Sequence, residues 1–289
     1  MKVAGRVAIV TGGGGGIGGA LAEELAAHGA RVVVADLDVA GAQTVADKIN
    51  AAAAGFAVAA GADVSDTACI RGLIALAEQR FGPVDLYFAN AGTVGVPGLE
   101  ASEADWDRSI DVNLRAHIRA AQLLIPGWVE RGEGYFVSTA SAAGLLTQIG
   151  SATYSVTKHA AVGFAEWLAI SYGDHGVRVS CLCPMGVNTE LLYAGEKSGD
   201  PRGVAATRAV TSAGEVLEPA QIARDVLAAV DEERFLILPH ATRAGHVPAE
   251  GHRLRPLAAR HAPLPGVVAG QHSMTTHPFP PVRSSRVPV

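Results

Sequence analysis

The sequence has few cysteines, few aromatic residues and no long apolar run, and each shortage excludes a class of protein. No apolar run reaches the roughly 18 residues that a membrane-spanning helix requires, so we expect no membrane protein. The chain starts on a strand pattern rather than a signal peptide, which predicts a cytoplasmic location. Its three cysteines, Cys69, Cys181 and Cys183, are an odd number without companion ligands at zinc spacing, which predicts reduced core thiols and no metal site.

Aromatic residues make up only 5% of the chain, whereas 49% is hydrophobic and Ala, Val and Gly are abundant. Small side chains of this kind suit the tight packing of helices on a parallel sheet. A chain of 289 residues can bury one sizeable core, and nothing in residues 1–240 marks an internal boundary. We therefore expect a single domain over residues 1–240.

Strand and helix patterns alternate strictly along this domain. Strands are predicted near 6–11, 31–36, 57–62, 84–89, 133–138, 177–183 and 235–238. Helices are predicted near 17–29, 40–54, 66–81, 103–128, 152–174 and 219–230. This alternation implies right-handed parallel crossovers and an α/β fold, a doubly wound, Rossmann-like parallel sheet of seven strands flanked by helices. In such a sheet the ligand binds at the carboxyl ends of the strands.

A run of five glycines, Gly12 to Gly16, separates the first predicted strand from the first predicted helix. Its main-chain N–H groups, with the positive end of the helix dipole, can approach a pyrophosphate because no Cβ intervenes. Gly12, Gly16, Ile17 and Gly18 are therefore candidate dinucleotide-binding residues. A flexible linker is the alternative interpretation of the glycines.

Two acidic residues follow the second and third predicted strands. Asp36 comes about 20 residues after the glycines, where a carboxylate can hydrogen-bond the adenosine ribose. It would repel a 2′-phosphate, and no glycine-loop position carries Arg or Lys, so NAD is predicted rather than NADP. Alternatively, Asp36 only ends the strand or caps the next helix. Asp63 is a second candidate, and it too could be only a helix cap.

Tyr154 and Lys158 lie one turn apart in a predicted helix, with Ser141 thirteen positions upstream of Tyr154. Positions i and i+4 share a helix face, so the Lys158 ammonium can lie beside the Tyr154 phenol. A neighbouring cation lowers the pKa of a phenol, which is near 10 when unperturbed. The two residues are a candidate acid and base, although a solvated surface pair has the same spacing.

Together these motifs resemble the short-chain dehydrogenase/reductase family, in its single-domain branch. Thr11 to Gly18 fits the family's Thr-Gly-x-x-x-Gly-x-Gly loop, and Ala89 to Gly92 includes its Asn-Ala-Gly motif. Pro184 to Thr189 is similar to the segment that lies along the nicotinamide, except that Met185 stands where the family usually has glycine. The resemblance covers residues 2 to about 240.

The resemblance implies a role for each candidate residue. The catalytic residues would be Asn113, Ser141, Tyr154 and Lys158. The cofactor-binding residues would be Gly12, Gly16, Ile17, Gly18, Asp36, Asp63, Val64, Asn90, Ala91, Gly92, Tyr154, Lys158, Pro184, Val187 and Thr189. Tyr154 would take the hydroxyl proton of an alcohol while NAD takes the hydride. Ser141 would hold the substrate oxygen, unless it only caps a turn, and Asn113 would hold a water linking Lys158 to solvent, unless it only faces solvent.

The substrate is less well specified. Candidate lining residues of an apolar pocket are Leu145, Leu146, Ile149, Met185, Leu191, Leu192 and Tyr193, the last four in a lid segment that reaches about Gly214. Such a pocket suits a hydrophobic secondary alcohol or ketone as the small-molecule substrate. The same residues would equally fit the core or an oligomer interface.

Two other functions fit part of the pattern. A non-catalytic dinucleotide-binding sensor or scaffold would need the glycines and Asp36, but not the four catalytic candidates together. A sugar-nucleotide epimerase or dehydratase would need a C-terminal substrate domain, for which the 49 residues after His240 are too few. Apolar residues beyond the core-facing stripe, including Trp106 and Trp167, favour a homo-oligomer, a dimer or a tetramer.

Residues 241–289 differ from the rest of the chain. They contain eight prolines, five histidines, six Arg and one Glu, a charge of +5, whereas residues 1–240 carry 17 basic and 27 acidic residues, a charge of −10. This composition predicts a disordered or atypical tail. Its charges are scattered without interleaved aromatics, so no nucleic acid or membrane partner is expected. An altered reading frame after His240 is a hypothesis that the gene's nucleotide sequence would test.

Overall fold

The computed structural model describes residues 1–240, and the predicted tail, residues 241–289, lies outside the described residues. Within residues 1–240, seven strands form one parallel sheet in the order β3-β2-β1-β4-β5-β6-β7. The strands are β1 (Val7–Thr11), β2 (Arg31–Asp36), β3 (Ala57–Gly61), β4 (Leu86–Ala89), β5 (Gly134–Thr139), β6 (Val177–Leu182) and β7 (Leu236–Ile237). The predicted doubly wound α/β fold is confirmed.

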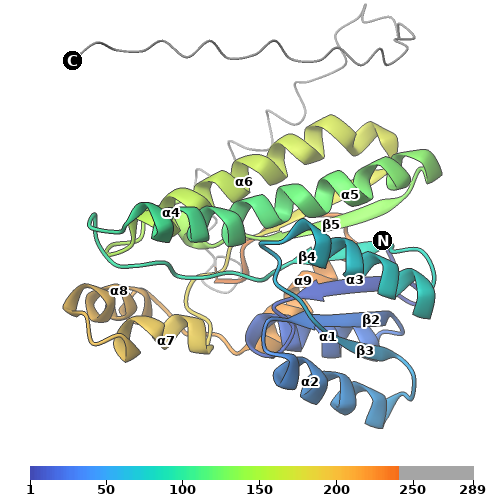
Figure 1. Cartoon of the computed structure of the whole chain (residues 1–289), viewed down its shortest axis with the longest axis horizontal. Helices are drawn as coiled ribbons and strands as arrows, with labels where there is room; N and C mark the ends of the chain where they lie inside the picture. The colour runs from blue at the N-terminus through green and yellow to red at the C-terminus, as the bar shows by residue number, and fades with distance from the viewer. Residues whose placement is uncertain (241–289) are drawn as a thin grey trace, which may run out of the picture.

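Helices cover both faces of the sheet. They are α1 (Gly16–Ala27), α2 (Val39–Ala52), α3 (Thr67–Arg80), α4 (Glu103–Ile110), α5 (Ala116–Arg131), α6 (Ala152–Tyr172), α7 (Glu190–Lys197), α8 (Pro201–Ser212) and α9 (Pro219–Asp231). One face is covered by α1, α2 and α9, and the other by α3, α5 and α6 (Figure 1). No helix in this part of the chain combines the length and apolar character needed to cross a membrane.

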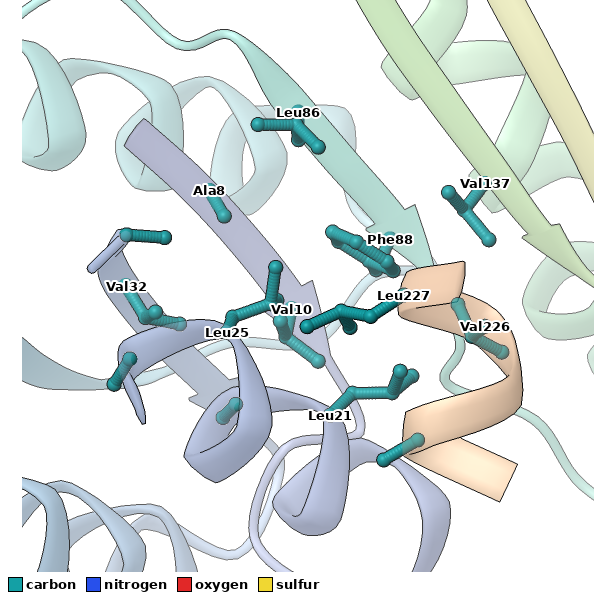
Figure 2. Packing of buried hydrophobic residues seen from close by; sticks show 14 of the residues in the cluster. Ala8, Val10, Leu21, Leu25, Val32, Leu86, Phe88, Val137, Val226 and Leu227 are labelled. Atoms are coloured by element: carbon teal, nitrogen blue, oxygen red, sulfur yellow. The ribbon is translucent and has the colours of Figure 1, made fainter. Parts of the chain in front are cut away.

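The central strands β1, β4 and β5 are buried at every position because their side chains alternate between two cores. In β1, Ala8 and Val10 pack toward α1 and α9, whereas Val7 and Ile9 enter the core beneath α3, α5 and α6. Figure 2 shows the first of these cores, where side chains of α1 and α9 meet those of β1, β2, β4 and β5. This packing fixes the strand ends that carry the candidate site.

The structure departs from the predicted helices in two places. The single helix predicted over 103–128 is interrupted by a π-turn, η1 (Asp111–Arg115), between α4 and α5. The lid segment holds two helices that were not predicted, α7 and α8, drawn in gold at one side of the sheet in Figure 1. Thr189 caps α7, and Asp200 caps α8 directly before Pro201, a common arrangement at helix starts.

The strand order reverses between β1 and β4. From β1 the chain passes to β2 on one side, and after β3 it crosses back to place β4 on the other side. A crevice opens at the carboxyl ends of the strands at such a switch point. The glycine loop follows β1, and Asn90 follows β4, so both motifs lie at this crevice.

Candidate active site

A cavity of about 1000 Å³ lies at the carboxyl ends of the strands. Among the predicted site residues, it is lined by Gly12, Gly16, Ile17, Gly18, Asp36, Asp63, Val64, Asn90, Ala91, Gly92, Ser141, Tyr154, Lys158, Pro184, Val187 and Thr189. Asn113 is the predicted site residue that does not line it. Residues separated by up to 177 positions in the sequence, from Gly12 to Thr189, thus share one cavity.

The glycine loop presents bare main chain to this cavity. Gly12 has a φ of 64°, and a Cβ there would lie 2.9 Å from the Cα of Ala91, so a side chain is excluded. At Gly15 a Cβ would meet nothing within 4 Å, because the loop faces open space just before α1 begins. The loop is a strand-to-helix turn at a helix N-terminus, where an anion can bind, so the linker interpretation of the glycines is wrong.

The Asp36 carboxylate is fixed by two main-chain donors. The N–H of Gly14 donates to Oδ2 at 2.8 Å, and the N–H of Asp38 donates to Oδ1 at 2.9 Å. The cap of α2 is Asp38, not Asp36, so the alternative role of Asp36 as a helix cap is wrong. Leu37, the next residue, is 70% exposed at the cavity edge.

Asp63 and Val64 line the cavity just beyond β3. Asp63 accepts a hydrogen bond from the N–H of Ser65 at 2.9 Å, and hydrogen bonds from Ser65 lower the pKa of Asp63. The charge of Arg108 lowers it further, and Arg108 itself lines the cavity, which the sequence pattern did not indicate. Because α3 is capped by Asp66, the alternative role of Asp63 as a cap is wrong.

Tyr154 and Lys158 lie on the first turns of α6, which begins at the cap residue Ser151. Only 8% of Tyr154 and 2% of Lys158 is exposed, so the interpretation as a solvated surface pair is wrong. The Lys158 Nζ lies 5.6 Å from the centre of the Tyr154 ring and donates to the Thr139 carbonyl at 2.9 Å. The ammonium therefore lies over the ring and is anchored to the end of β5.

Burial controls the ionisation of both residues. It raises the pKa of Tyr154, and the neighbouring Ser141 hydroxyl opposes this shift. The net shift of the Tyr154 pKa is upward, so the lowering predicted from the helical spacing of Tyr154 and Lys158 is not found in the protein alone. Burial also lowers the pKa of Lys158 to about 8.

Ser141 caps a turn, as one interpretation of the sequence predicted, and its contact with a substrate oxygen stays a prediction. It caps the short 3₁₀ turn η2 (Ala142–Gly144), because its Oγ accepts from the N–H of Ala143 at 3.1 Å. The same hydroxyl is close enough to the Tyr154 phenol to lower its pKa, and it donates to the Pro184 carbonyl at 3.5 Å. Capping holds the hydroxyl at the cavity wall beside the phenol.

Asn113 is fully buried in the π-turn, so the alternative that it faces solvent is wrong. Its Oδ1 accepts from the N–H of Thr93 at 2.8 Å, and its Nδ2 donates to the Thr93 carbonyl and to Thr157 Oγ1. A Cβ at Gly92 would lie 3.3 Å from Asn113 Oδ1 and 3.4 Å from Lys158 Nζ. Asn113 thus lies near the Lys158 ammonium, and its side-chain amide is hydrogen-bonded to Thr93 and Thr157. The water relay stays a prediction.

One end of the cavity is apolar. Five of the predicted lining residues contribute to it: Leu146, Ile149, Met185, Leu191 and Leu192. Leu145 packs instead against the core beneath α6, and Tyr193 does not line the cavity. Helix α8, absent from the predicted elements, adds Ala206, Thr207, Ala209 and Val210, and the residue that follows it, Ala213, also lines the cavity. The predicted apolar pocket is therefore present, but some of its lining residues differ from those predicted.

The cysteines and buried histidine lie outside the cavity lining. Cys69, Cys181 and Cys183 are free thiols. His117 is buried, its Nδ1 lies 3.0 Å from Ser138 Oγ, and burial lowers its pKa to about 3, so it packs as a neutral ring. Among residues 1–240, no group of three or more His, Cys, Asp or Glu is placed to hold a metal ion.

The burial of Lys158 predicts that Lys158→Met stabilises the cofactor-free protein near pH 7. Below pH about 8 the lysine is charged in both the folded and unfolded states, and the cost of burying its ammonium is fully present. Between about 8 and 10.5 the folded state releases its proton first, so this cost disappears as the pH rises. After subtracting the lost Thr139 hydrogen bond, we expect the free energy of unfolding to rise by about 1–3 kcal/mol.

Urea unfolding of both proteins without nucleotide, near pH 7 and again near pH 10, measures this difference. The gain should shrink at the higher pH because the wild-type lysine is then largely neutral when folded. A Lys158→Met protein less stable than the wild type near pH 7 would show that the ammonium is well paired rather than poorly solvated.

Comparisons with known proteins agree with this geometry. A family model described as short chain dehydrogenase matches residues 6–198. Momilactone A synthase of Oryza sativa subsp. japonica is 38% identical over 201 residues, which cover 67% of this chain and 70% of that protein. Cyclohexanol dehydrogenase of Acinetobacter sp. (strain SE19) is 35% identical over 195 residues, 67% of this chain and 77% of that protein.

A solved structure has the same fold. A short chain dehydrogenase/reductase from Burkholderia phymatum, crystallised in complex with NAD, superposes with a TM-score of 0.77 at 30% identity, covering 93% of this chain and 99% of that chain. The family model covers well over half of the 289 residues. The chain therefore belongs to the short chain dehydrogenase family, whose members are oxidoreductases.

Proposed function

We propose that this protein is an NAD-dependent oxidoreductase that transfers a hydride between the nicotinamide and a hydrophobic secondary alcohol or ketone. The proposal rests on the set of residues that line one cavity. Its walls combine an anion cradle at Gly12 to Gly16, the fixed carboxylate of Asp36, the Ser141, Tyr154 and Lys158 side chains, and an apolar end beneath α7 and α8.

The residues present fit a dinucleotide. The pyrophosphate would lie on the N-terminus of α1, where Gly12 cannot carry a side chain and Gly15 is open. Asp36 would accept hydrogen bonds from the adenosine ribose, and Asp63 with Val64 would hold the adenine side. Asn90, Ala91 and Gly92 would lie along the middle of the dinucleotide, and Pro184, Val187 and Thr189 along its nicotinamide end. The Burkholderia phymatum structure, solved with NAD, supports this choice of cofactor.

Tyr154 would act as the acid and base. NAD, when bound, accepts the hydride in alcohol oxidation. The Tyr154 oxygen takes the hydroxyl proton, and the Ser141 hydroxyl holds the substrate oxygen by a hydrogen bond. Oxidation requires the ionised phenol, which the nearby Lys158 ammonium favours and burial opposes. In the direction of ketone reduction the buried, protonated phenol is the required form, so reduction needs no ionisation of the free enzyme.

The substrate end favours a compact apolar molecule. Leu146 and Ile149 are exposed toward it, and α8 supplies small side chains that leave room for a ring. Arg108 also lines the cavity, and because its charge lowers the pKa of Asp63 we assign it to the adenosine end rather than to a clamp for a substrate phosphate or carboxylate. The similarity to a cyclohexanol dehydrogenase supports alicyclic alcohols as the first compounds to test.

A panel of alcohols and ketones, followed at the absorbance band of reduced nicotinamide with NAD and NADP in parallel, tests the proposal. We expect turnover of alicyclic secondary alcohols or ketones with the NAD couple and little turnover of open-chain polyols. Binding of NAD without turnover of any compound would favour the alternative function, a non-catalytic dinucleotide sensor or scaffold. Absence of NAD binding would contradict the cofactor assignment itself.

We also propose that the protein is a cytoplasmic homo-oligomer, a dimer or a tetramer. Trp167 and Ile170 of α6 are exposed, and Trp167 stacks on Phe164 to extend an apolar surface. Two-fold packing of this surface against a second copy would remove it from water. The molar mass by light scattering tests the assembly, and deletion of residues 241–289 tests whether the tail affects it.

A further inference from the structure

A histidine from the end of the described chain binds the turn that follows β6. The N–H of Met185 donates to His240 Nδ1 at 3.2 Å, and His240 Nε2 lies 3.0 Å from the carbonyl oxygen of Gly186. His240 is 55 residues away from Met185 in the sequence. Both contacts are made to consecutive main-chain groups of one turn.

The partners of the ring determine its tautomer. A main-chain N–H can only donate, so Nδ1 must accept and the proton lies on Nε2, which donates to Gly186. The neutral ring therefore offers one acceptor and one donor to one N–H and one C=O. Lys and Arg have no acceptor, and ionised Asp and Glu have no donor, so few side chains can replace this contact.

The turn held by His240 is part of the cavity wall. Met185 and Val187 line the cavity on either side of Gly186. The Pro184 carbonyl accepts from the N–H of Ala142 at 2.8 Å, and the Gly186 carbonyl also accepts from the N–H of Leu217 at 2.9 Å. The segment is thus attached to the η2 turn on one side and to the chain before α9 on another. His240 supplies a third attachment, at the main-chain N–H of Met185.

We propose that His240 is a positioning residue for the nicotinamide half of the dinucleotide. The inference rests on the proposed function, because it assumes that the Pro184 to Thr189 segment lies along the nicotinamide. His240 lines no part of the cavity and acts through the main chain of Met185 and Gly186. The adenosine end would instead be held by the glycine loop and by Asp36, whose carboxylate accepts from Gly14. Loss of His240 should therefore weaken contacts to the nicotinamide and leave contacts to the adenosine diphosphate unchanged.

Calorimetric titration of His240→Ala with NAD and with ADP-ribose separates the two halves, because ADP-ribose lacks the nicotinamide. We expect the NAD affinity to fall by about five- to tenfold, the order expected for losing one or two neutral hydrogen bonds. The ADP-ribose affinity should stay within about twofold of the wild-type value, since no contact to it is changed. His175→Ala is the matched control, because His175 is exposed just before β6 and so lies at the amino ends of the strands, opposite the cavity.

A second variant, His240→Asn, gives a graded result if His240→Ala folds poorly. The asparagine carbonyl can still accept from Met185, but its shorter amide cannot reach Gly186 as the imidazole does. Its NAD affinity should lie between those of the wild type and His240→Ala, at constant ADP-ribose affinity. Equal weakening of NAD and ADP-ribose, or unchanged NAD affinity in both variants, would overturn the inference alone. If the wild-type protein binds ADP-ribose as tightly as NAD, the nicotinamide contributes no affinity and the inference fails. If the wild-type protein binds neither nucleotide, the proposed function fails as well.

Discussion

Tyr154→Phe is expected to abolish turnover while leaving the NAD affinity within a few-fold of the wild-type value. The change removes the oxygen that takes or gives the proton, and general acid and base catalysis contributes about 10²–10⁴-fold to a rate. It leaves the glycine loop and Asp36, which would bind the dinucleotide, untouched. Steady-state kcat and a direct titration with NAD measure the two effects separately.

Tyr135→Phe is the matched control for this variant. Tyr135 is another buried tyrosine, on β5, and its hydroxyl lies 2.9 Å from Ser180 Oγ in the core rather than in the cavity. Its loss should reduce stability by about 1 kcal/mol and leave kcat unchanged. If Tyr154→Phe kept about a tenth or more of the wild-type kcat, Tyr154 could not be the main acid and base.

Cofactor choice is the second large effect. We expect a preference for NAD over NADP of roughly hundredfold or more in kcat/KM, because ribose hydroxyls would donate charge-assisted hydrogen bonds to Asp36, each worth about 1.5–3 kcal/mol. A 2′-phosphate would meet the same carboxylate at a cost of about 1 kcal/mol or more. Both Asp36 oxygens are held by main-chain donors, so the carboxylate cannot easily turn away.

Asp36→Ala should reduce the preference for NAD mainly by weakening the binding of NAD. Leu37→Arg in the same background should raise the kcat/KM with NADP. Leu37 is suited to this change because it is exposed at the cavity edge. Asp66→Ala is the control: Asp66 also follows a strand and caps α3, but it does not line the cavity, so the cofactor ratio should stay constant. Wild-type kcat/KM values for NAD and NADP that lie within about threefold of each other would show that Asp36 does not face the ribose.

Local patterns were enough to predict the strands and the loop at the strand ends. Buried strands such as β1 and β2 are recognisable as short apolar runs. The glycines between β1 and α1 are recognisable because this turn leaves no room for side chains at positions such as Gly12. Other features leave a weaker local signal. Asp200 and Pro201 are a cap and a first-turn proline, and this pair could have indicated α8. The π-turn at Asn113 left no trace in the apolar period of the predicted helix, because a single widened turn shifts the pattern very little.

Contacts between distant segments could not be predicted from spacing. The helical separation of Tyr154 and Lys158 indicated that they share a face, but not that the ammonium would lie over the ring and bind Thr139. Arg108 influences the pKa of Asp63 only because two distant segments, α4 and the loop after β3, line the same cavity. His240 meets Met185 because β6 and β7 are neighbours, a pairing that depends on the order of the whole sheet.

Isotope transfer shows whether a hydride passes between the substrate carbon and the nicotinamide. The best alcohol from the panel, carrying deuterium on its carbinol carbon, is incubated with NAD and the wild-type protein, and the reduced nucleotide is analysed by mass spectrometry. We expect the reduced nucleotide to carry the deuterium on its nicotinamide ring, and we expect Tyr154→Phe to form almost none of it. Reduced nucleotide that lacks deuterium would contradict direct hydride transfer. So would tight NAD binding with no turnover of any alcohol by NAD or of any ketone by the reduced nucleotide.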